Sequence, residues 1–301
     1  MARAETLGAL PERELVSPGH LACQGCGAAL AMRLVLKALG PRTVVVLPAS
    51  CWSVINGPML SSAVGVPLLH TAFEAAGAVA AGVRAGLSLR GLDDVTVLAW
   101  AGDGGTFDIG LQALSGAAER EEDFLYVCYD NEAYMNTGVQ RSGATPWGAW
   151  TTTTPTPQTK ATRKKDIVAI LVAHRIPYAA TASIAFPGDL IAKVERAAAL
   201  RGTRFLHVLS PCPPGWRTDP DQTIRLARLA VETRVFPLYE VRGGWDYHIT
   251  HEPRGLPVGE YLRRQGRFAH LGPEDVARAQ AEVDARWEEL LARCRRPPRP
   301  A

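Results

Sequence analysis

The sequence has no long hydrophobic run and no large excess of charge of one sign. No apolar stretch approaches the roughly 20 residues that a membrane-spanning helix needs, although 47% of the 301 residues are hydrophobic. The formal net charge is +3, and no block of Lys or Arg is interleaved with aromatic residues. The first residues are charged and lack the apolar core of a secretory leader. We therefore expect a cytoplasmic protein that binds neither membranes nor nucleic acid.

Lysine and asparagine are scarce. Only five of the 33 basic residues are Lys, and the only asparagines are Asn56, Asn131 and Asn136. A scarcity of thermolabile Asn suits a hot habitat, but a GC-rich genome gives the same bias, so composition does not decide between them. Two of the three asparagines, Asn131 and Asn136, fall in one short segment.

Strand and helix patterns alternate through the first 233 residues. Apolar runs predict strands at 43–47, 95–100, 124–129, 178–182 and 204–209. Helical spacing of apolar residues, which includes Ile109 and Leu111, predicts helices at 28–39, 73–89, 107–119, 166–173, 188–200 and 220–233. This alternation predicts an α/β fold with a mainly parallel, doubly wound sheet and helices on both faces.

The remaining residues, 234–301, lose this alternation. They contain a possible strand pair at 238–241 and 245–248, followed by possible helices at 258–264 and 273–295. A separate domain of this size would have a small core. We therefore expect one domain at 1–233 and a C-terminal extension at 234–301 that packs on it or on a partner subunit.

A strand–helix–strand unit carries polar residues at its strand ends. The first strand runs into the sequence from Gly102 to Gly105, and the second is followed by Asn131. Ligands bind at this edge of open α/β sheets, and glycines before a helix let the backbone approach a phosphate. Asp103 and Asn131 provide the oxygen ligands that Mg²⁺ prefers beside a diphosphate. Gly-Asp-Gly alone is also an ordinary turn.

Four of the six cysteines lie in loops flanked by Gly or Pro. They are Cys23, Cys26, Cys51 and Cys212. By contrast, Cys128 lies inside an apolar strand and Cys294 near the end of a charged helix. Four loop thiolates suit either Zn²⁺ or a 4Fe-4S cluster, and their spacing does not decide between them. Disulfides are a further alternative, which needs an oxidising compartment.

The segments GDGGTFDIGLQALSGAAER and YDNEAYMNTGVQRSGATP resemble the β subunit of pyruvate:ferredoxin oxidoreductase and its branched-chain 2-oxoacid relatives. The resemblance extends from about residue 19 to residue 216 and implies a thiamine diphosphate-binding fold. It implies that Asp103, Asn131 and the backbone carbonyl of Ala133 bind Mg²⁺, and that Asn136 contacts the cofactor and is catalytic. The cofactor-binding residues that it implies are Cys51, Gly102, Asp103, Gly104, Gly105, Thr106, Asn131 and Asn136.

The cysteine pattern is also similar to that family. CxGCG, a cysteine 25 residues after the second of the pair and a distant one in a Pro-rich loop match its proximal cluster ligands. The resemblance therefore implies that Cys23, Cys26, Cys51 and Cys212 bind a 4Fe-4S cluster. Some relatives carry Glu at the position of Ala28 as a cofactor contact, which puts that contact in doubt here.

The resemblance implies coenzyme A-dependent oxidative decarboxylation of pyruvate to acetyl-CoA and CO₂, with electrons passing through the cluster to ferredoxin. Alternative substrates are 2-oxoisovalerate and oxalate. A second, pyrimidine-binding domain and the ferredoxin-type run C-x₂-C-x₂-C-x₃-C-P are both absent. We therefore expect the activating glutamate and further clusters to come from an α subunit and from γ- or δ-type subunits or domains.

Two other functions remain open. One is a non-redox thiamine decarboxylase or synthase subunit with a structural zinc site, and the other is a non-catalytic scaffold subunit. The long segment 137–165, rich in Thr, Gly and Pro, follows the cofactor motif directly. We interpret it as a lid over the thiamine site or a partner contact, with a plain surface loop as the alternative.

Overall fold

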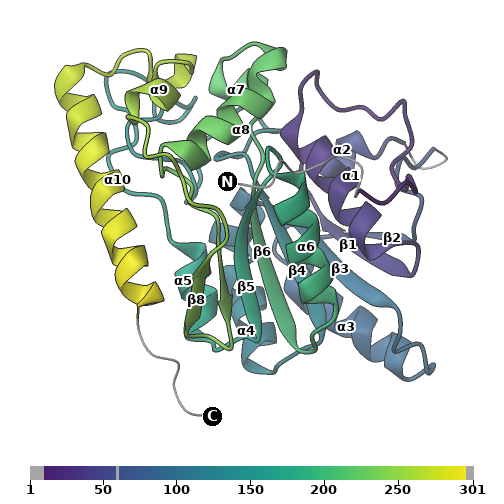
Figure 1. The fold of residues 1–301 in the computed structure, drawn as a ribbon. Coiled ribbons are helices and arrows are strands. Elements are labelled where there is room, and N and C mark those ends of the chain that lie inside the picture. Colours follow the sequence, from purple (N-terminus) through teal and green to yellow (C-terminus); the bar gives the residue numbers. More distant parts are fainter. Residues whose placement is uncertain (1–9, 59–60, 296–301) are drawn as a thin grey trace.

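An eight-stranded sheet forms the centre of the computed structural model, which describes residues 10–58 and 61–295 (Figure 1). The strand order is β2-β1-β3-β4-β6-β5-β7-β8. The first six strands in this order pair in parallel, and β7 and β8 extend the sheet in antiparallel pairs. The strands are β1 Thr43–Pro48, β2 Leu68–Thr71, β3 Thr96–Gly102, β4 Phe124–Asp130, β5 Tyr178–Ser183, β6 Thr203–Leu209, β7 Tyr239–Arg242 and β8 Asp246–Ile249.

Helices cover both faces of the sheet, as the predicted doubly wound fold requires (Figure 1). One face packs against α1, α6 and α8, and the other against α3, α4 and α5. The helices are α1 Gly27–Leu39, α2 Cys51–Ile55, α3 Ala76–Ser88, α4 Leu111–Glu119, α5 Ile167–Ala173, α6 Pro187–Ala198, α7 Pro213–Trp216, α8 Thr223–Glu232, α9 Gly259–Leu262 and α10 Pro273–Cys294. None of these helices combines the length and apolar content that crossing a membrane requires.

Strand β1 shows why the central strands are continuously apolar. Val45 and Leu47 belong to the core under α1 and α6, whereas Val46 between them belongs to the core under α3 and α4. Successive strand residues point to opposite faces, so a strand covered on both sides must be apolar at every position. Every residue of β4 and β6 is also buried, and the polar exceptions among them, such as Arg204 and His207, are paired with Asp123 and Asp130.

The predicted strands and long helices are confirmed to within a few residues, and so is the C-terminal strand pair. The two strands of that pair join the main sheet beside β5. The short elements β2, α2 and α7 were not predicted. They have four or five residues each. Such lengths are too short for a helical period to show, and β2 is a partly exposed edge strand without a buried apolar run.

The helix predicted at 107–119 is wrong in its first turns. Residues Gly105–Ile109 form a π-turn, in which the amide of Gly110 bonds to the carbonyl of Gly105 at 2.8 Å, and α4 starts only at Leu111. A π-turn adds one residue to the turn and shifts the helical period. Consequently Ile109, predicted to lie on the buried face, is 53% exposed.

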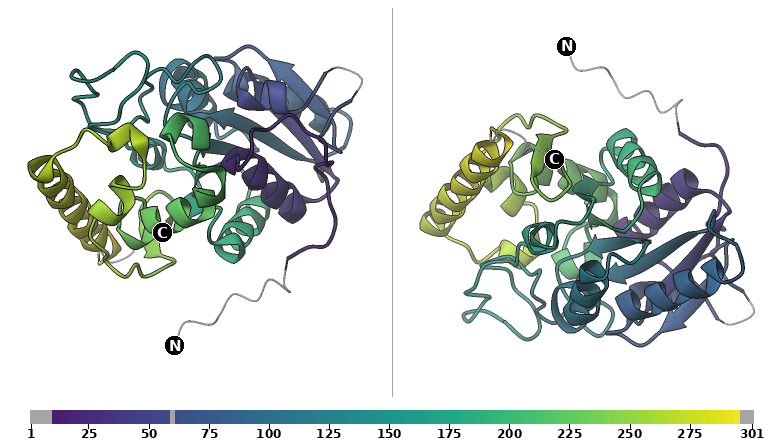
Figure 2. Two further views of the ribbon diagram at one scale, coloured as in Figure 1. Left: turned by 90° about the horizontal axis from the view of Figure 1, so that it is seen from above. Right: turned by 90° about the horizontal axis from the view of Figure 1, so that it is seen from below.

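The strand register brings several loops to one edge of the sheet. Gly102 at the end of β3 pairs with Tyr129 of β4, and Asp130 at the end of β4 pairs with Leu209 of β6. The carboxyl ends of these parallel strands therefore meet at the edge drawn uppermost in Figure 1, where α7 begins. Segment 137–165 also folds over this edge, as the teal loop seen from above in Figure 2.

Candidate functional site

A cavity of about 190 Å³ opens at this edge, between the segments that follow β1, β3 and β4. Its walls contain all but one of the residues predicted to bind the cofactor or Mg²⁺. These are Cys51, Gly102, Asp103, Gly104, Gly105, Asn131, Ala133 and Asn136. Thr106 does not line the cavity: it is buried, and its hydroxyl donates to the carbonyl of Gly102 at 2.8 Å. Any contact from Thr106 would have to come from its backbone.

Asp103 is the buried acid of this cavity. It follows β3 directly and is 1% exposed, and the hydroxyl of Ser142 donates to its Oδ2 at 2.6 Å. Ser142 belongs to segment 137–165, so that loop supplies part of the site wall. The sequence motif indicated Asp103, but it gave no sign of Ser142.

Three oxygen-bearing groups, those of Asp103, Asn131 and Ala133, converge at one point of the cavity wall. One terminal atom of the Asn131 amide lies 2.9 Å from Asp103 Oδ1 and 3.0 Å from the carbonyl oxygen of Ala133. With nitrogen at that position, the amide donates hydrogen bonds to both oxygens. With oxygen there, one carboxylate, one amide oxygen and one carbonyl oxygen face the same point, which is the ligand chemistry that Mg²⁺ prefers. The predicted ligands therefore fit a magnesium ion.

The two neighbouring acids differ in their pKa. Burial raises the pKa of Asp103 well above its usual range, and the carboxylate of Asp130 raises it further. Asp130 is just as buried, but Lys164 and His207 outweigh the effect of burial and lower its pKa to about 2. His207 Nε2 lies 2.6 Å from Asp130 Oδ2. Asp130 is therefore a fixed negative charge behind Asp103.

Asp108 of the π-turn forms hydrogen bonds and an ion pair with residues of the loop that surrounds the cavity. Asp108 Oδ2 accepts hydrogen bonds from the Tyr134 hydroxyl at 2.7 Å and from the Gly143 amide at 2.8 Å. Lys165 pairs with Asp108 Oδ1 at 2.7 Å. The Tyr134 ring lies directly against Gly104, where any Cβ atom would overlap it. Glycine at position 104 is therefore what permits this close packing of the Tyr134 ring.

The four loop cysteines come from segments that hydrogen-bond to one another. The amide of Gly27, next to Cys26, donates to the carbonyl of Pro211, next to Cys212, at 3.1 Å. Trp52, next to Cys51, donates through its indole Nε1 to the carbonyl of Ala28 at 3.1 Å. The six cysteines form no disulfide with one another, and only Cys128 among them is completely buried.

Electrostatics also reflect the proximity of these thiols. Burial raises the pKa of Cys51 to about 12, and Cys212 and Cys26 contribute to the rise. Burial likewise raises the pKa of Cys212 to about 11, with further contributions from Cys26 and Cys23. Burial also raises the pKa of Cys26, and hydrogen bonds from the backbone amides of Ala29 and Ala28 offset part of that increase. Neighbouring thiols that would repel one another once deprotonated suit a shared cationic centre, either a zinc ion or an iron–sulfur cluster.

Within residues 10–58 and 61–295, no three His, Cys, Asp or Glu side chains are placed to hold a single metal ion. The cavity also has walls that sequence reasoning missed, among them Phe73, Tyr129 and Met135. Tyr129 is the last residue of the strand predicted at 124–129. Its place at that strand end was the only feature of the sequence that pointed to the site.

Comparison with known proteins identifies the family. The family described as thiamine pyrophosphate enzyme, C-terminal TPP binding domain, matches residues 54–208, about half of the chain. The ketoisovalerate oxidoreductase subunit VorB of Pyrococcus abyssi is 50% identical over 294 residues, which cover 93% of this chain and 94% of that protein. The pyruvate synthase subunit PorB of Methanothermobacter thermautotrophicus is 50% identical over 285 residues, 93% of this chain and 99% of that protein.

A solved structure has the same fold. The 2-oxoglutarate:ferredoxin oxidoreductase from Magnetococcus marinus, with 2-oxoglutarate, coenzyme A and succinyl-CoA bound, superposes with a TM-score of 0.59. The match covers 75% of this chain and 82% of that one at 21% identity. The site geometry, the family match and the relatives agree: this chain belongs to the thiamine diphosphate-binding β subunits of the 2-oxoacid:ferredoxin oxidoreductase family.

Proposed function

We propose that this chain binds thiamine diphosphate, Mg²⁺ and a 4Fe-4S cluster and converts pyruvate and coenzyme A to acetyl-CoA and CO₂ with its partner subunits. The observation that carries the proposal is the cavity in which the Asp103 carboxylate, the Asn131 amide and the Ala133 carbonyl converge beside Cys51. The groups of Asp103, Asn131 and Ala133 are suited to a divalent cation, and the thiol of Cys51 on another wall belongs to the proposed cluster site.

The residues of the cavity have distinct proposed roles. Asp103, Asn131 and the carbonyl of Ala133 would hold Mg²⁺ against the diphosphate, and Gly104 and Gly105 would let the phosphates approach the backbone. Asn136 is exposed at the cavity wall, where it can orient the cofactor. When bound, thiamine diphosphate supplies the carbanion chemistry that decarboxylates a 2-oxoacid. Asp103 cannot serve as a solvent-exposed base, because its carboxylate is buried and bonded to Ser142.

Cys23, Cys26, Cys51 and Cys212 are the proposed cluster ligands. Their segments are held together by backbone hydrogen bonds, and Cys51 borders the cofactor cavity directly. A cluster in this place would lie within electron-transfer reach of the cofactor and could pass electrons on towards ferredoxin. The alternative, a zinc site in a non-redox thiamine enzyme, uses the same thiols and differs in its metal.

Pyruvate is the proposed substrate because relatives of 46–50% identity are named pyruvate synthase subunits. Relatives named ketoisovalerate oxidoreductase subunits are equally similar, so 2-oxoisovalerate is the second candidate. The substrate pocket is expected to be shared with an α subunit, which would also supply the glutamate that activates the cofactor. Further clusters, from γ- or δ-type subunits or domains, would carry electrons to ferredoxin in the cytoplasm.

An anaerobic assay of the purified complex tests this proposal. Reduction of a viologen dye is followed with coenzyme A and, in turn, pyruvate, 2-oxoisovalerate and oxalate. The proposal predicts the highest kcat/KM for pyruvate and the presence of iron and acid-labile sulfide. A higher kcat/KM for 2-oxoisovalerate would assign the chain to the second candidate, and zinc in place of iron would favour the non-redox enzyme.

A further inference from the structure

Glu132 separates the two residues that are proposed to bind Mg²⁺ after β4. Its φ is 71°, in the left-handed region that residues other than glycine rarely adopt. This backbone conformation is what allows the side chain of Asn131 and the carbonyl of Ala133 to face the same point beside Asp103. A strained residue at a binding site persists only when its surroundings hold it in place.

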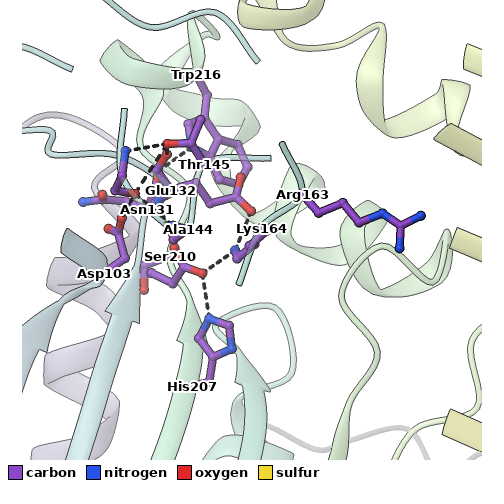
Figure 3. A network of polar contacts seen from close by, with 12 residues as sticks. Asp103, Asn131, Glu132, Ala144, Thr145, Arg163, Lys164, His207, Ser210 and Trp216 are labelled. Atoms are coloured by element: carbon purple, nitrogen blue, oxygen red, sulfur yellow. Dashed lines mark hydrogen bonds and ion pairs between the residues drawn. The ribbon is translucent and has the colours of Figure 1, made fainter. Parts of the chain in front are cut away.

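The surroundings of Glu132 do hold it. Its side chain is almost completely buried and receives two cations from distant parts of the chain. Lys164 Nζ donates to Oε1 at 2.8 Å, and Arg267 Nη2 donates to Oε2 at 2.6 Å (Figure 3 shows the Lys164 contact). Lys164 also pairs with Asp130, so one ammonium group joins the residues before and after Asn131.

The backbone of the same turn is fixed as well. The amide of Glu132 donates to Asp130 Oδ1 at 2.9 Å, and the Thr145 hydroxyl donates to the carbonyl of Glu132 at 2.7 Å. Trp216 Nε1 donates to the carbonyl of Asn131 at 2.8 Å. Three hydrogen bonds from distant or neighbouring groups thus hold the backbone at Asn131 and Glu132.

We propose that Glu132 is a positioning residue for the cation. Its buried pairs with Lys164 and Arg267 hold the left-handed turn that directs Asn131 and Ala133 towards Asp103. This inference rests on the proposed Mg²⁺ and thiamine diphosphate site. A rigid turn should favour Mg²⁺ over Ca²⁺, because Mg²⁺ requires near-ideal octahedral geometry whereas Ca²⁺ tolerates flexible ligands. A loosened turn should therefore weaken Mg²⁺ binding more than Ca²⁺ binding.

The chain offers a matched control for this test. Arg163 precedes Lys164 but points away from the network in Figure 3, and its side chain is 78% exposed, at 3.4 Å from Glu282. Arg163→Met removes one positive charge from the same segment without touching Glu132. Glu132→Gln keeps the shape of the side chain and removes its charge, and Lys164→Met removes the shared cation.

The experiment is calorimetric titration of the assembled complex with Mg²⁺ and, separately, Ca²⁺, in the presence of thiamine diphosphate. We expect Glu132→Gln and Lys164→Met to raise the Kd for Mg²⁺ about tenfold or more, the usual effect of losing a group that supports a ligand. The Kd for Ca²⁺ should change less than about threefold. Arg163→Met should bind both ions like the wild type. Saturating Mg²⁺ should restore kcat to near the wild-type value.

The outcomes separate this inference from the function on which it rests. A wild-type complex without Mg²⁺-dependent thiamine diphosphate binding would contradict the proposed function itself. Normal wild-type binding, with unchanged or equally weakened Mg²⁺ and Ca²⁺ binding in both variants, would contradict only the role of Glu132. If Glu132→Gln does not assemble, the same titration is carried out with Arg267→Lys. Lysine keeps the positive charge but lacks the planar guanidinium group, so a normal preference for Mg²⁺ over Ca²⁺ in this variant would overturn the proposal.

Discussion

Ser142 donates a 2.6 Å hydrogen bond to the carboxylate of Asp103, although the two residues are 39 positions apart in the sequence. This contact joins the irregular segment 137–165 to the Gly-Asp-Gly motif. The same segment also bonds to Asp108 through Gly143 and Lys165. Segment 137–165 is therefore a fixed wall of the cavity at these positions.

The first prediction concerns Ser142. Ser142→Ala leaves one oxygen of the buried Asp103 carboxylate without its donor, so the carboxylate is less well oriented towards Mg²⁺. We expect the Kd for Mg²⁺ in the presence of thiamine diphosphate to rise about tenfold. Ser88→Ala is the matched control, because Ser88 donates a similar bond, at 2.7 Å, to the exposed Asp93. Equal Mg²⁺ affinity in both variants would show that Ser142 has no part in the site.

The second prediction compares the two side-chain ligands. Asp103→Ala should reduce thiamine diphosphate binding more than Asn131→Ala, because the carboxylate carries charge and the amide contributes only a neutral oxygen. Calorimetric titration of the assembled complex with cofactor and Mg²⁺ measures both. Wild-type affinity in Asp103→Ala would mean that Gly-Asp-Gly is only a turn.

Sequence reasoning succeeded where a strand end fixes the position of a side chain. Asp103 and Asn131 follow buried apolar strands, and parallel strands bring their carboxyl ends to the same edge. The order of strands and long helices was predictable for the same reason, since the apolar periods are strong. No such period exists in segment 137–165, so the contacts of Ser142 and Lys164 depend on loop conformation alone.

The errors also have physical causes. The π-turn at Gly105–Ile109 changes the helical period by one residue, which reversed the expected burial of Ile109. Arg267 pairs with Glu132, from which it is 135 positions away in the sequence. No motif around either residue predicts this contact, because it depends on how the loops fold.

The third prediction concerns the cysteines. Alanine at position 23, 26, 51 or 212 should each cause loss of the cluster. Cys128→Ala and Cys294→Ala should keep it, because Cys128 lies inside β4 and Cys294 at the end of α10. Iron analysis and visible absorbance under anaerobic conditions distinguish the two groups. Full iron occupancy in Cys212→Ala would refute the ligand assignment.

The fourth prediction is a pH dependence of stability at Lys160. Burial lowers the pKa of Lys160 from its ordinary value of 10.5 to about 8. Between these values the folded chain has released the proton and the unfolded chain retains it, so the free energy of unfolding rises with pH. Lys160→Met removes this contribution.

Denaturant unfolding of wild type and Lys160→Met at about pH 7.5 and about pH 9.5 measures the effect. The difference between the two proteins should shift in favour of the wild type at the higher pH. A difference that is independent of pH would contradict the lowered pKa.

The most direct test of the account is reconstitution of activity from separate subunits. This chain is proposed to hold the diphosphate end of the cofactor and one cluster, while the activating glutamate and further clusters come from its partners. The chain alone, with thiamine diphosphate, Mg²⁺ and an intact cluster, should not reduce ferredoxin or a viologen dye with pyruvate and coenzyme A under anaerobic conditions. Adding the partner subunits should restore the reaction, and adding them to Asp103→Ala should not. Substantial turnover by the isolated chain would contradict the account.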